Sequence, residues 1–262
     1  MNPAGLVDTH CHLNHAQFDS DRSEAIERAR SAEVQRLLVI GCDLESSRFA
    51  LELAEQSAGL QAAVGIHPES AADWTDQTAD ALAGLVRNHR PLVAAWGEIG
   101  LDFYYPDGAP RDLQIRVFEE QLSRAADLNL PVIIHCRESY DEIMAVIERR
   151  PSTRGVLHCF TGTGDEARRA VDAGLYLGVG GIATFKKSTE LRAAIASVPR
   201  ERLLLETDSP YLAPQPWRGK RNEPAYVRAV ADMLAELLDL TVDEVAALTS
   251  ANAEVLFGRM DQ

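Results

Sequence analysis

Four histidines and two carboxylates in this chain are placed where they could hold divalent metal ions together. They are His10, His12, Glu98, His135, His158 and Asp208. Each lies at the carboxyl end of a short apolar run of the kind that forms a buried strand. Mixed imidazole and carboxylate ligands suit zinc, manganese, iron or cobalt, and they suit magnesium where carboxylates and water dominate. The set therefore predicts a site for divalent cations.

The first two histidines are separated by a single residue. In an extended segment His10 and His12 project to the same side, so both imidazoles can reach one ion. Asp8 shares that face, and we expect it to orient one of the ligands as a supporting carboxylate. A carboxylate at the end of a buried run, such as Glu98, must be paired, protonated or bound to metal, because an isolated charge there is very costly.

The number of ligands points to the chemistry. Six ligands are too many for one catalytic ion, which must keep an open coordination position. Two ions about 3.5–4 Å apart that share Glu98 through its two oxygens fit better. Such a pair lowers the pKa of a bridging water and binds the oxygens of a phosphate or a carbonyl. The residues therefore predict a metal-dependent hydrolase.

Eight short apolar runs carry or precede these residues. They lie at 5–10, 36–41, 61–67, 91–98, 130–135, 155–160, 175–180 and 202–208. Most are nearly continuous rather than alternating, which is typical of parallel strands covered by helices. Stretches with apolar residues three or four apart lie between the runs or after the last one and predict helices. They include 21–32, 45–57, 112–128, 138–149, 165–173, 224–238 and 242–257.

Alternating strands and helices predict the fold class. Repeated eight times, the pattern closes most economically as an α/β fold, the (β/α)8 TIM barrel, whose active sites lie at the carboxyl ends of the strands. An open doubly wound sheet is the alternative. It would need a glycine-rich phosphate turn after the first strand, where this chain has the segment 8–12 instead. We expect one metal-dependent hydrolase barrel domain over residues 1–262.

The composition of the chain limits its expected cellular location and the classes of partner that it could bind. No apolar run approaches the roughly 20 residues that span a bilayer, and residues 1–10 lack the features of a signal peptide. The four cysteines form no paired framework. We therefore expect a cytoplasmic protein without membrane contact, and a monomer is favoured. A net charge of −14 argues against a general polyanion binder, although bound cations would cancel part of this charge at the site.

At these motifs the chain strongly resembles the TatD family of metal-dependent deoxyribonucleases, within the amidohydrolase-like barrels. The resemblance runs almost from end to end. It is carried by DTHCHL at 8–13, GIHP at 65–68, GEIGLD at 97–102, PVIIHCRES at 131–139, VLHCFTG at 156–162, LETDSPYLAP at 205–214 and RGKRNEP at 218–224.

The resemblance assigns roles to the candidate ligands. It implies that His10, His12 and Asp208 hold one ion, that Glu98 bridges, and that the histidines of the fifth and sixth strands hold the second ion. The implied activity is cleavage of DNA phosphodiester bonds, as a 3′→5′ exonuclease or as an endonuclease, with two divalent ions (Mg, Mn or Zn), and the exonuclease is favoured. Glu98 and Asp208 are the catalytic candidates, and Asp208 would orient the attacking water or take its proton.

Other side chains are candidates for binding the DNA substrate, which we expect to be single-stranded or to have frayed ends. His67 matches GIHP and could form a hydrogen bond with a phosphate or with a metal-bound water. Arg137 and Arg218 are candidate phosphate clamps, because a guanidinium grips phosphate with two parallel hydrogen bonds. Tyr104 and Tyr105 could stack on a base.

Two other functions remain open from the sequence. An amidohydrolase or deacylase would act on a small C–N substrate or an aminoacyl ester. Several such barrels carry a carboxylated lysine on the fourth strand, where this chain has Glu98. A metal-loaded binding protein without turnover is the other alternative, and the complete ligand set argues against it.

Overall fold

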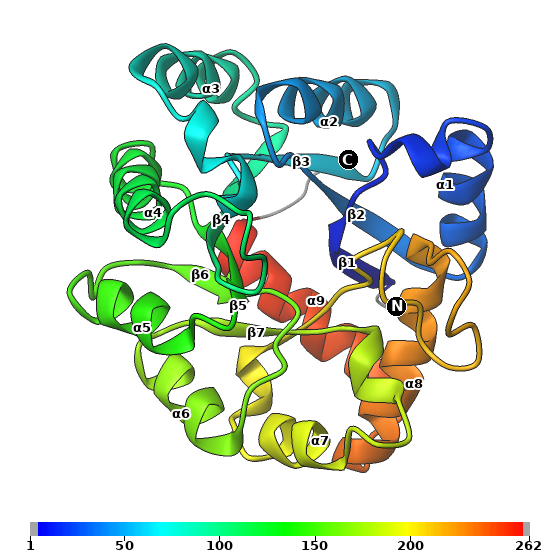
Figure 1. Ribbon diagram of the computed structural model, residues 1–262. Helices are drawn as coiled ribbons and strands as arrows, with labels where there is room; N and C mark the ends of the chain where they lie inside the picture. Colours follow the sequence, from blue (N-terminus) through cyan, green and yellow to red (C-terminus); the bar gives the residue numbers. More distant parts are fainter. Residues whose placement is uncertain (1–4, 259–262) are drawn as a thin grey trace.

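A computed structural model describes residues 5–258 and shows eight parallel strands around a barrel (Figure 1). The strands are β1 (Leu6–Cys11), β2 (Val34–Ile40), β3 (Leu60–Val64), β4 (Val93–Asp102), β5 (Val132–Arg137), β6 (Gly155–Leu157), β7 (Tyr176–Val179) and β8 (Leu203–Leu205). Each strand pairs with the next one along the chain. At the last seam the Asp208 N–H donates to the His10 carbonyl at 2.8 Å, and the His12 N–H donates to the Ser209 carbonyl at 2.7 Å. The predicted TIM barrel is therefore confirmed.

Helices form the outer ring, as the apolar spacing predicts. Within the described residues they are α1 (Arg22–Ser31), α2 (Leu44–Gln56), α3 (Asp76–Asn88), α4 (Arg111–Asp127), α5 (Tyr140–Glu148), α6 (Gly164–Asp172), α7 (Thr189–Ala196), α8 (Val227–Leu238) and α9 (Val242–Phe257). Capping side chains determine where several of these helices begin. Asp43, Thr163 and Thr241 each accept a backbone N–H at the first turn of α2, α6 and α9. None of these helices is long and apolar enough to cross a membrane.

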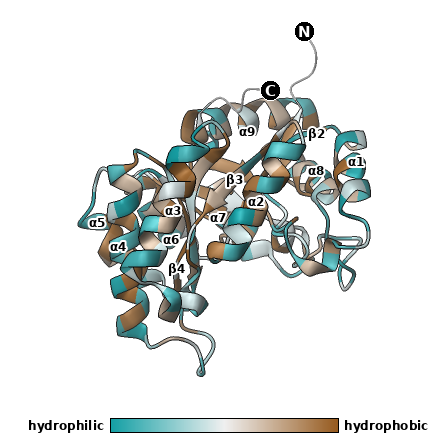
Figure 2. Ribbon diagram, turned by 90° about the horizontal axis from the view of Figure 1, so that it is seen from above, coloured by the Kyte–Doolittle hydropathy of each residue, from teal (hydrophilic) through white to brown (hydrophobic). Residues whose placement is uncertain are grey.

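Helix α9 crosses the amino-terminal end of the barrel (Figures 1 and 2). Ser250 donates to the Gly5 carbonyl, and Asn252 donates to the Leu203 carbonyl. Leu256 and Phe257 pack with the apolar side chains inside the barrel. These inward-facing residues are Val7, Leu38, Ile40, Ala63, Ala94, Ala95, Ile133, Val156, Tyr176 and Leu204. Because packed side chains fill this end, the polar strand residues gather at the opposite, carboxyl end.

Four strands end three or four residues away from the ends that the apolar runs predict. Strand β3 stops at Val64 instead of residue 67, and β6 stops at Leu157 instead of residue 160. Strand β4 continues past Glu98 to Asp102, because Gly100 adopts φ +136° and lets β4 lie against β5. A Cβ at Gly100 would lie 2.1 Å from the His135 carbonyl oxygen. Strand β8 stops at Leu205, so Asp208 lies on the following turn, with φ +58°. The differences at the ends of β4 and β8 come from backbone geometry that an apolar run does not encode.

Candidate metal centre

The six predicted ligands meet at the carboxyl ends of the strands. Five are buried, with exposed fractions between 0% and 9%: His10, His12, Glu98, His158 and Asp208. The side chain of His135 is 17% exposed. They arrive from β1, β4, β5 and the residues that follow β6 and β8, so chain segments far apart in sequence build one centre.

One cluster of ligand atoms forms around His10 of β1 and His12, the residue that follows this strand. His10 Nε2 and His12 Nε2 lie 3.2 Å apart. Asp208 Oδ1 lies 3.6 and 3.4 Å from these two nitrogens, and Glu98 Oε2 lies 3.5 and 3.9 Å from them. Ligands bonded at about 2.1 Å to one ion stand about 3.0–3.5 Å from one another, so this cluster, called cluster 1, has the spacing of a metal site.

A second cluster uses the other oxygen of the same glutamate. Glu98 Oε1 lies 2.8 Å from His135 Nδ1 and 2.9 Å from His158 Nε2. The two nitrogens are 3.3 Å apart. The His158 ring stacks on the His10 ring with centroids 3.9 Å apart, so this cluster 2 adjoins cluster 1. Each carboxylate oxygen of Glu98 thus faces a different pair of imidazoles.

Asp102 fixes the orientation of the His135 ring. Its Oδ2 lies 3.0 Å from His135 Nε2, so Nε2 donates to it and Nδ1 is turned to the carboxylate oxygen of Glu98, at 2.8 Å. Burial lowers the pKa of His135, but the hydrogen bonds with Asp102 and Glu98 outweigh it and raise this pKa, so without a metal ion Nδ1 holds a proton where a cation would lie. His10 Nε2 and His12 Nε2 also face each other at 3.2 Å, a spacing that one proton or one cation can bridge. The donor types and spacings therefore fit divalent cations at both clusters.

The protonation states differ among the candidate ligands. Burial raises the pKa of Glu98, but the imidazoles of His158, His67 and His10 outweigh it and hold this pKa well below its ordinary value. Glu98 is therefore a carboxylate at neutral pH. Burial, together with His158, lowers the pKa of His10, which keeps this imidazole neutral. Burial lowers the pKa of His12, His135 and His158, but the facing acidic groups outweigh it and raise all three. Neutral imidazoles and ionised carboxylates are the forms that bind metal ions, so an incoming ion must displace protons from these three histidines.

Asp102 was not among the predicted site residues. Its backbone is fixed by Gln114, whose Oε1 accepts the Asp102 N–H at 2.9 Å and whose Nε2 donates to the Asp102 carbonyl at 3.0 Å. A usable signal was present, because residues 98, 100 and 102 share one face of an extended strand. The early end predicted for β4 concealed it.

Glu206 and Cys42 also border the centre and were missed. Glu206 is fully buried, accepts the Cys159 N–H and lies 3.7 Å from His158 Nδ1. Its carboxylate occupies the space over Gly178, where a Cβ would come within 2.2 Å of Oε2. Cys42 Sγ lies 3.8 Å from both His12 Nδ1 and Glu98 Oε2. Cys42 follows an apolar run, and nothing in its spacing marks it as a site residue. Glu206 lies two residues before Asp208 and would share its face of an extended strand, so a signal was present for it.

His67 lies at the edge of cluster 2. Its Nε2 is 3.7 Å from Glu98 Oε1, and its ring packs edge-on against His135 with centroids 4.5 Å apart. Burial lowers the pKa of His67 to about 4, so the ring is neutral. Because its Nδ1 accepts the Glu69 N–H at 3.2 Å, the proton sits on Nε2, which faces the centre as a donor.

The two predicted phosphate clamps are placed differently. Arg137 follows His135 by two residues, stacks over Tyr104 and donates to the Tyr105 hydroxyl at 3.1 Å. Arg218 is exposed and lies over the Phe185 ring, with 4.5 Å from Cζ to the ring centroid. The structure brings Arg137 beside the centre, whereas the contact recorded for Arg218 is outside it.

The expectation for Asp8 was wrong. Its carboxylate accepts the backbone N–H groups of Thr207 at 2.9 Å and His10 at 3.2 Å, and it pairs with the Thr207 hydroxyl at 2.6 Å. It therefore joins β1 to the end of β8 instead of orienting an imidazole. Burial raises the pKa of Asp8 to about 8.

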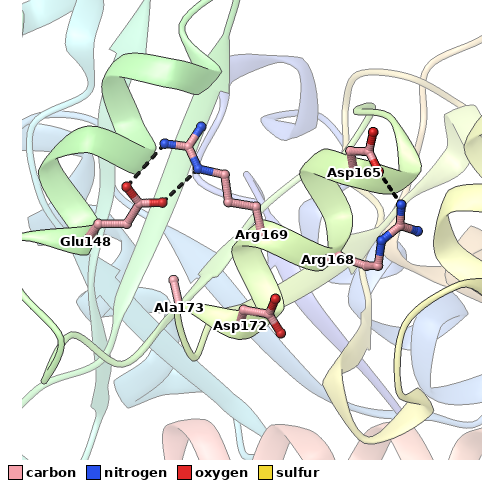
Figure 3. Close-up of a pocket in the computed structure, with 6 residues that line it drawn as sticks. All are labelled: Glu148, Asp165, Arg168, Arg169, Asp172 and Ala173. Atoms are coloured by element: carbon pink, nitrogen blue, oxygen red, sulfur yellow. Dashed lines mark hydrogen bonds and ion pairs between the residues drawn. The ribbon is translucent and has the colours of Figure 1, made fainter.

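A hollow on the outer surface lies away from this centre, between α5 and α6 (Figure 3). Its arginines are already paired. Arg169 Nε donates to Glu148 at 2.7 Å, and Arg168 pairs with Asp165. Another hollow, lined by Cys136, Ser139 and Thr161 among others, opens beside His158 at the barrel mouth.

Comparison with known proteins identifies the relatives. Residues 7–258 match the family model described as TatD related DNase. The chain is 41% identical over 254 residues to the uncharacterized metal-dependent hydrolase YabD of Bacillus subtilis, covering 96% of this chain and 98% of YabD. It is 37% identical over 262 residues to the 3′-5′ ssDNA/RNA exonuclease TatD of Citrobacter koseri, covering 97% and 99%. The crystal structure of YjjV, a TatD homologue from Escherichia coli K12, superposes with a TM-score of 0.91 at 33% identity, covering 97% and 98%. A TIM barrel with this ligand-rich mouth and these relatives belongs to the TatD-related DNase family and is a hydrolase.

Proposed function

We propose that this protein cleaves phosphodiester bonds of single-stranded DNA, removing nucleotides from the 3′ end, with two divalent ions held by its six clustered ligands. The observation that supports this most directly is the position of Glu98, whose two oxygens each face a different pair of imidazoles. The naming of relatives as 3′-5′ ssDNA/RNA exonucleases supports the substrate class.

In this proposal cluster 1 and cluster 2 each hold one ion, with Glu98 shared. The ions supply Lewis-acid activation of a water and neutralise charge on the phosphate. Magnesium, manganese and zinc are the candidate ions, since imidazoles and carboxylates are both present. Cys42, beside cluster 1, adds a thiol that favours a softer ion such as zinc.

Asp208 is the proposed proton acceptor. Its side chain is 13% exposed, against 4% for Glu98, so it is the carboxylate of cluster 1 that water reaches more easily. Its Oδ1 faces the imidazoles of His10 and His12. Among the described residues no hydrogen bond is formed by its Oδ2, which can therefore receive a proton from the attacking water.

His67 and Arg137 are proposed to hold the phosphate. The neutral His67 presents its Nε2–H to the centre and donates to a phosphate oxygen without competing as a ligand. Arg137 adds positive charge on the side of β5, where its guanidinium is held in place by two tyrosines. Arg218 would contact the phosphate backbone further from the centre. We also propose a cytoplasmic location, where the four free cysteines stay reduced.

The test pairs metal analysis with cleavage. The purified protein is given 3′- and 5′-labelled single- and double-stranded DNA with Mg²⁺, Mn²⁺ or Zn²⁺, and bound metal is measured in parallel. We expect metal-dependent loss of 3′ nucleotides in the wild-type protein. The Glu98→Ala variant should show no cleavage and should bind at least one ion fewer. Metal-dependent hydrolysis of aminoacyl esters or N-acyl compounds without DNA cleavage would contradict the proposal and favour the amidohydrolase alternative.

A further inference from the structure

Exposed aromatic and apolar side chains gather at the mouth of the barrel. Among the described residues, the large hydrophobic side chains that are exposed are Tyr104 (49%), Tyr105 (46%), Tyr211 (46%), Leu212 (39%) and Val255 (72%). The first four lie on the loops that leave β4 and β8, next to the metal centre, and the fifth lies on α9 at the opposite end. Exposed apolar side chains concentrated in one place mark a binding surface.

Tyr211 forms one surface, beside cluster 1. Its backbone N–H donates to the Asp208 carbonyl at 2.9 Å. Its ring packs edge-on against His12, with centroids 6.0 Å apart, and against His15, with centroids 5.7 Å apart. These two edge contacts fix the ring next to the centre and leave 46% of the residue exposed.

Tyr104 and Arg137 form a second surface, beside cluster 2. The guanidinium carbon of Arg137 lies 3.8 Å from the centroid of the Tyr104 ring, and Tyr105 is edge-on to that ring at 5.0 Å. The Tyr104 N–H donates to Asp102 Oδ1 at 3.0 Å, and Asp102 also holds His135. Asp102 thus connects the flat cation–π pair of Arg137 and Tyr104 to His135 of cluster 2.

The two surfaces stand on opposite sides of the centre. In a ring ordered from β1 to β8, the strands β4 and β5 lie across from β8 and β1. Glu98, shared by both clusters, lies between them. A phosphodiester bound at the metal centre would therefore have one nucleoside directed to each surface.

We propose that each surface stacks one base of a single-stranded nucleic acid, so that the two bases flanking the cleaved phosphate are held apart on Tyr211 and on the Tyr104–Arg137 pair. The inference rests on the phosphodiesterase function proposed above. A flat ring stacks on any base, so this recognition is tolerant of sequence. Bases inside a duplex are already stacked on their neighbours, so the arrangement selects single strands and frayed ends. Arg137 beside the ring matches the negative charge of the adjoining phosphate.

The test removes each ring and each base in turn. The variants are Tyr211→Leu and Tyr104→Leu, with Tyr211→Phe and Tyr104→Phe as ring-retaining controls and Val255→Ala as a control far from the mouth. The substrates are a labelled oligonucleotide and two copies with an abasic nucleotide on one or the other side of the cleaved bond. We expect each Leu variant to lower kcat/KM on the intact strand about tenfold or more, mainly through KM. The Phe variants keep the stacking ring and recover most of each loss, whereas Val255→Ala keeps wild-type values. Each loss disappears on one of the abasic substrates.

A binding measurement separates this inference from the proposed function. Oligonucleotides carrying 2-aminopurine at either position are mixed with protein without added metal, and stacking is read as fluorescence quenching that each Leu variant removes at one position. An equal loss on intact and abasic strands, or quenching unchanged in both Leu variants, would overturn the inference. Quenching that follows the tyrosines in a protein that cleaves no nucleic acid would support base stacking and refute only the nuclease function.

Discussion

Replacing Asp102 with asparagine tests the support of cluster 2. Asp102 is 2% exposed, and its Oδ2 lies 3.0 Å from His135 Nε2, so it holds the imidazole with Nδ1 turned to Glu98. Asp102→Asn keeps the volume and an Oδ1 that can accept the Tyr104 N–H, but it removes the negative charge facing the imidazole. Loss of such a supporting carboxylate weakens metal binding about 10- to 100-fold, or about 1.4–2.7 kcal/mol.

The effect should be confined to one of two sites. Titration of the metal-free protein with Mn²⁺ or Zn²⁺ against a chromophoric chelator should give one affinity lowered by that factor. The other affinity, assigned to His10, His12 and Asp208, should stay within about threefold because its ligand atoms do not contact Asp102. The matched control is Asp107→Asn, an exposed carboxylate on the same loop that loses the same charge. Equal weakening of both sites, or the same weakening in the control, would refute the reasoning.

Two further predictions concern stability. Arg221 forms two parallel contacts with Asp21, at 2.6 and 2.7 Å, and lowers the pKa of this carboxyl below its ordinary value. A depressed folded-state pKa stabilises the protein above the unfolded value of about 3.9, and this stabilisation is lost as pH falls through the folded value. Asp21→Asn should therefore lower the free energy of unfolding at pH 7 by about 1 kcal/mol, and the melting temperature should fall with it. Calorimetry should show that the difference from wild type shrinks below about pH 4. A difference that is constant with pH would contradict this. Leu204 lies inside the barrel and is 0% exposed, so Leu204→Ala should lower the free energy of unfolding by about 2–5 kcal/mol in denaturant unfolding. Val255 is 72% exposed, so Val255→Ala should change this free energy by less than about 0.5 kcal/mol. Comparable losses in the two variants would be inconsistent with the packed interior.

The barrel and the meeting of its ligands were predictable from residue order alone. Strands buried on both faces read as unbroken apolar runs, and such runs marked all eight strands. Parallel strands in a barrel bring their carboxyl ends together, so a histidine at the end of one run must approach a histidine at the end of another. This is why His10 and His158, nearly 150 positions apart, could be placed together before any contact was known.

Contacts that depend on tertiary structure could not be foreseen. Arg221 lies three residues after the predicted phosphate clamp Arg218, but it is paired with Asp21 at a separation of 200 residues. Glu206 looked like part of an apolar run, and only the space over Gly178 gives it room beside His158. The turn that carries Asp208 likewise follows from a left-handed backbone angle.

The hydrogen bonds between β1 and the end of β8 have a consequence for the order in which the protein is assembled. The seam where Asp8 pairs with Thr207 is also where His10 and His12 meet Asp208, so ring closure and completion of cluster 1 are one event. During synthesis a nascent chain already contains every ligand of cluster 2 once residue 158 has emerged, but cluster 1 must wait for residue 208. An ion held at cluster 1 would link the first strand to the last, and its binding energy would add to the stability of the closed ring over any opened form.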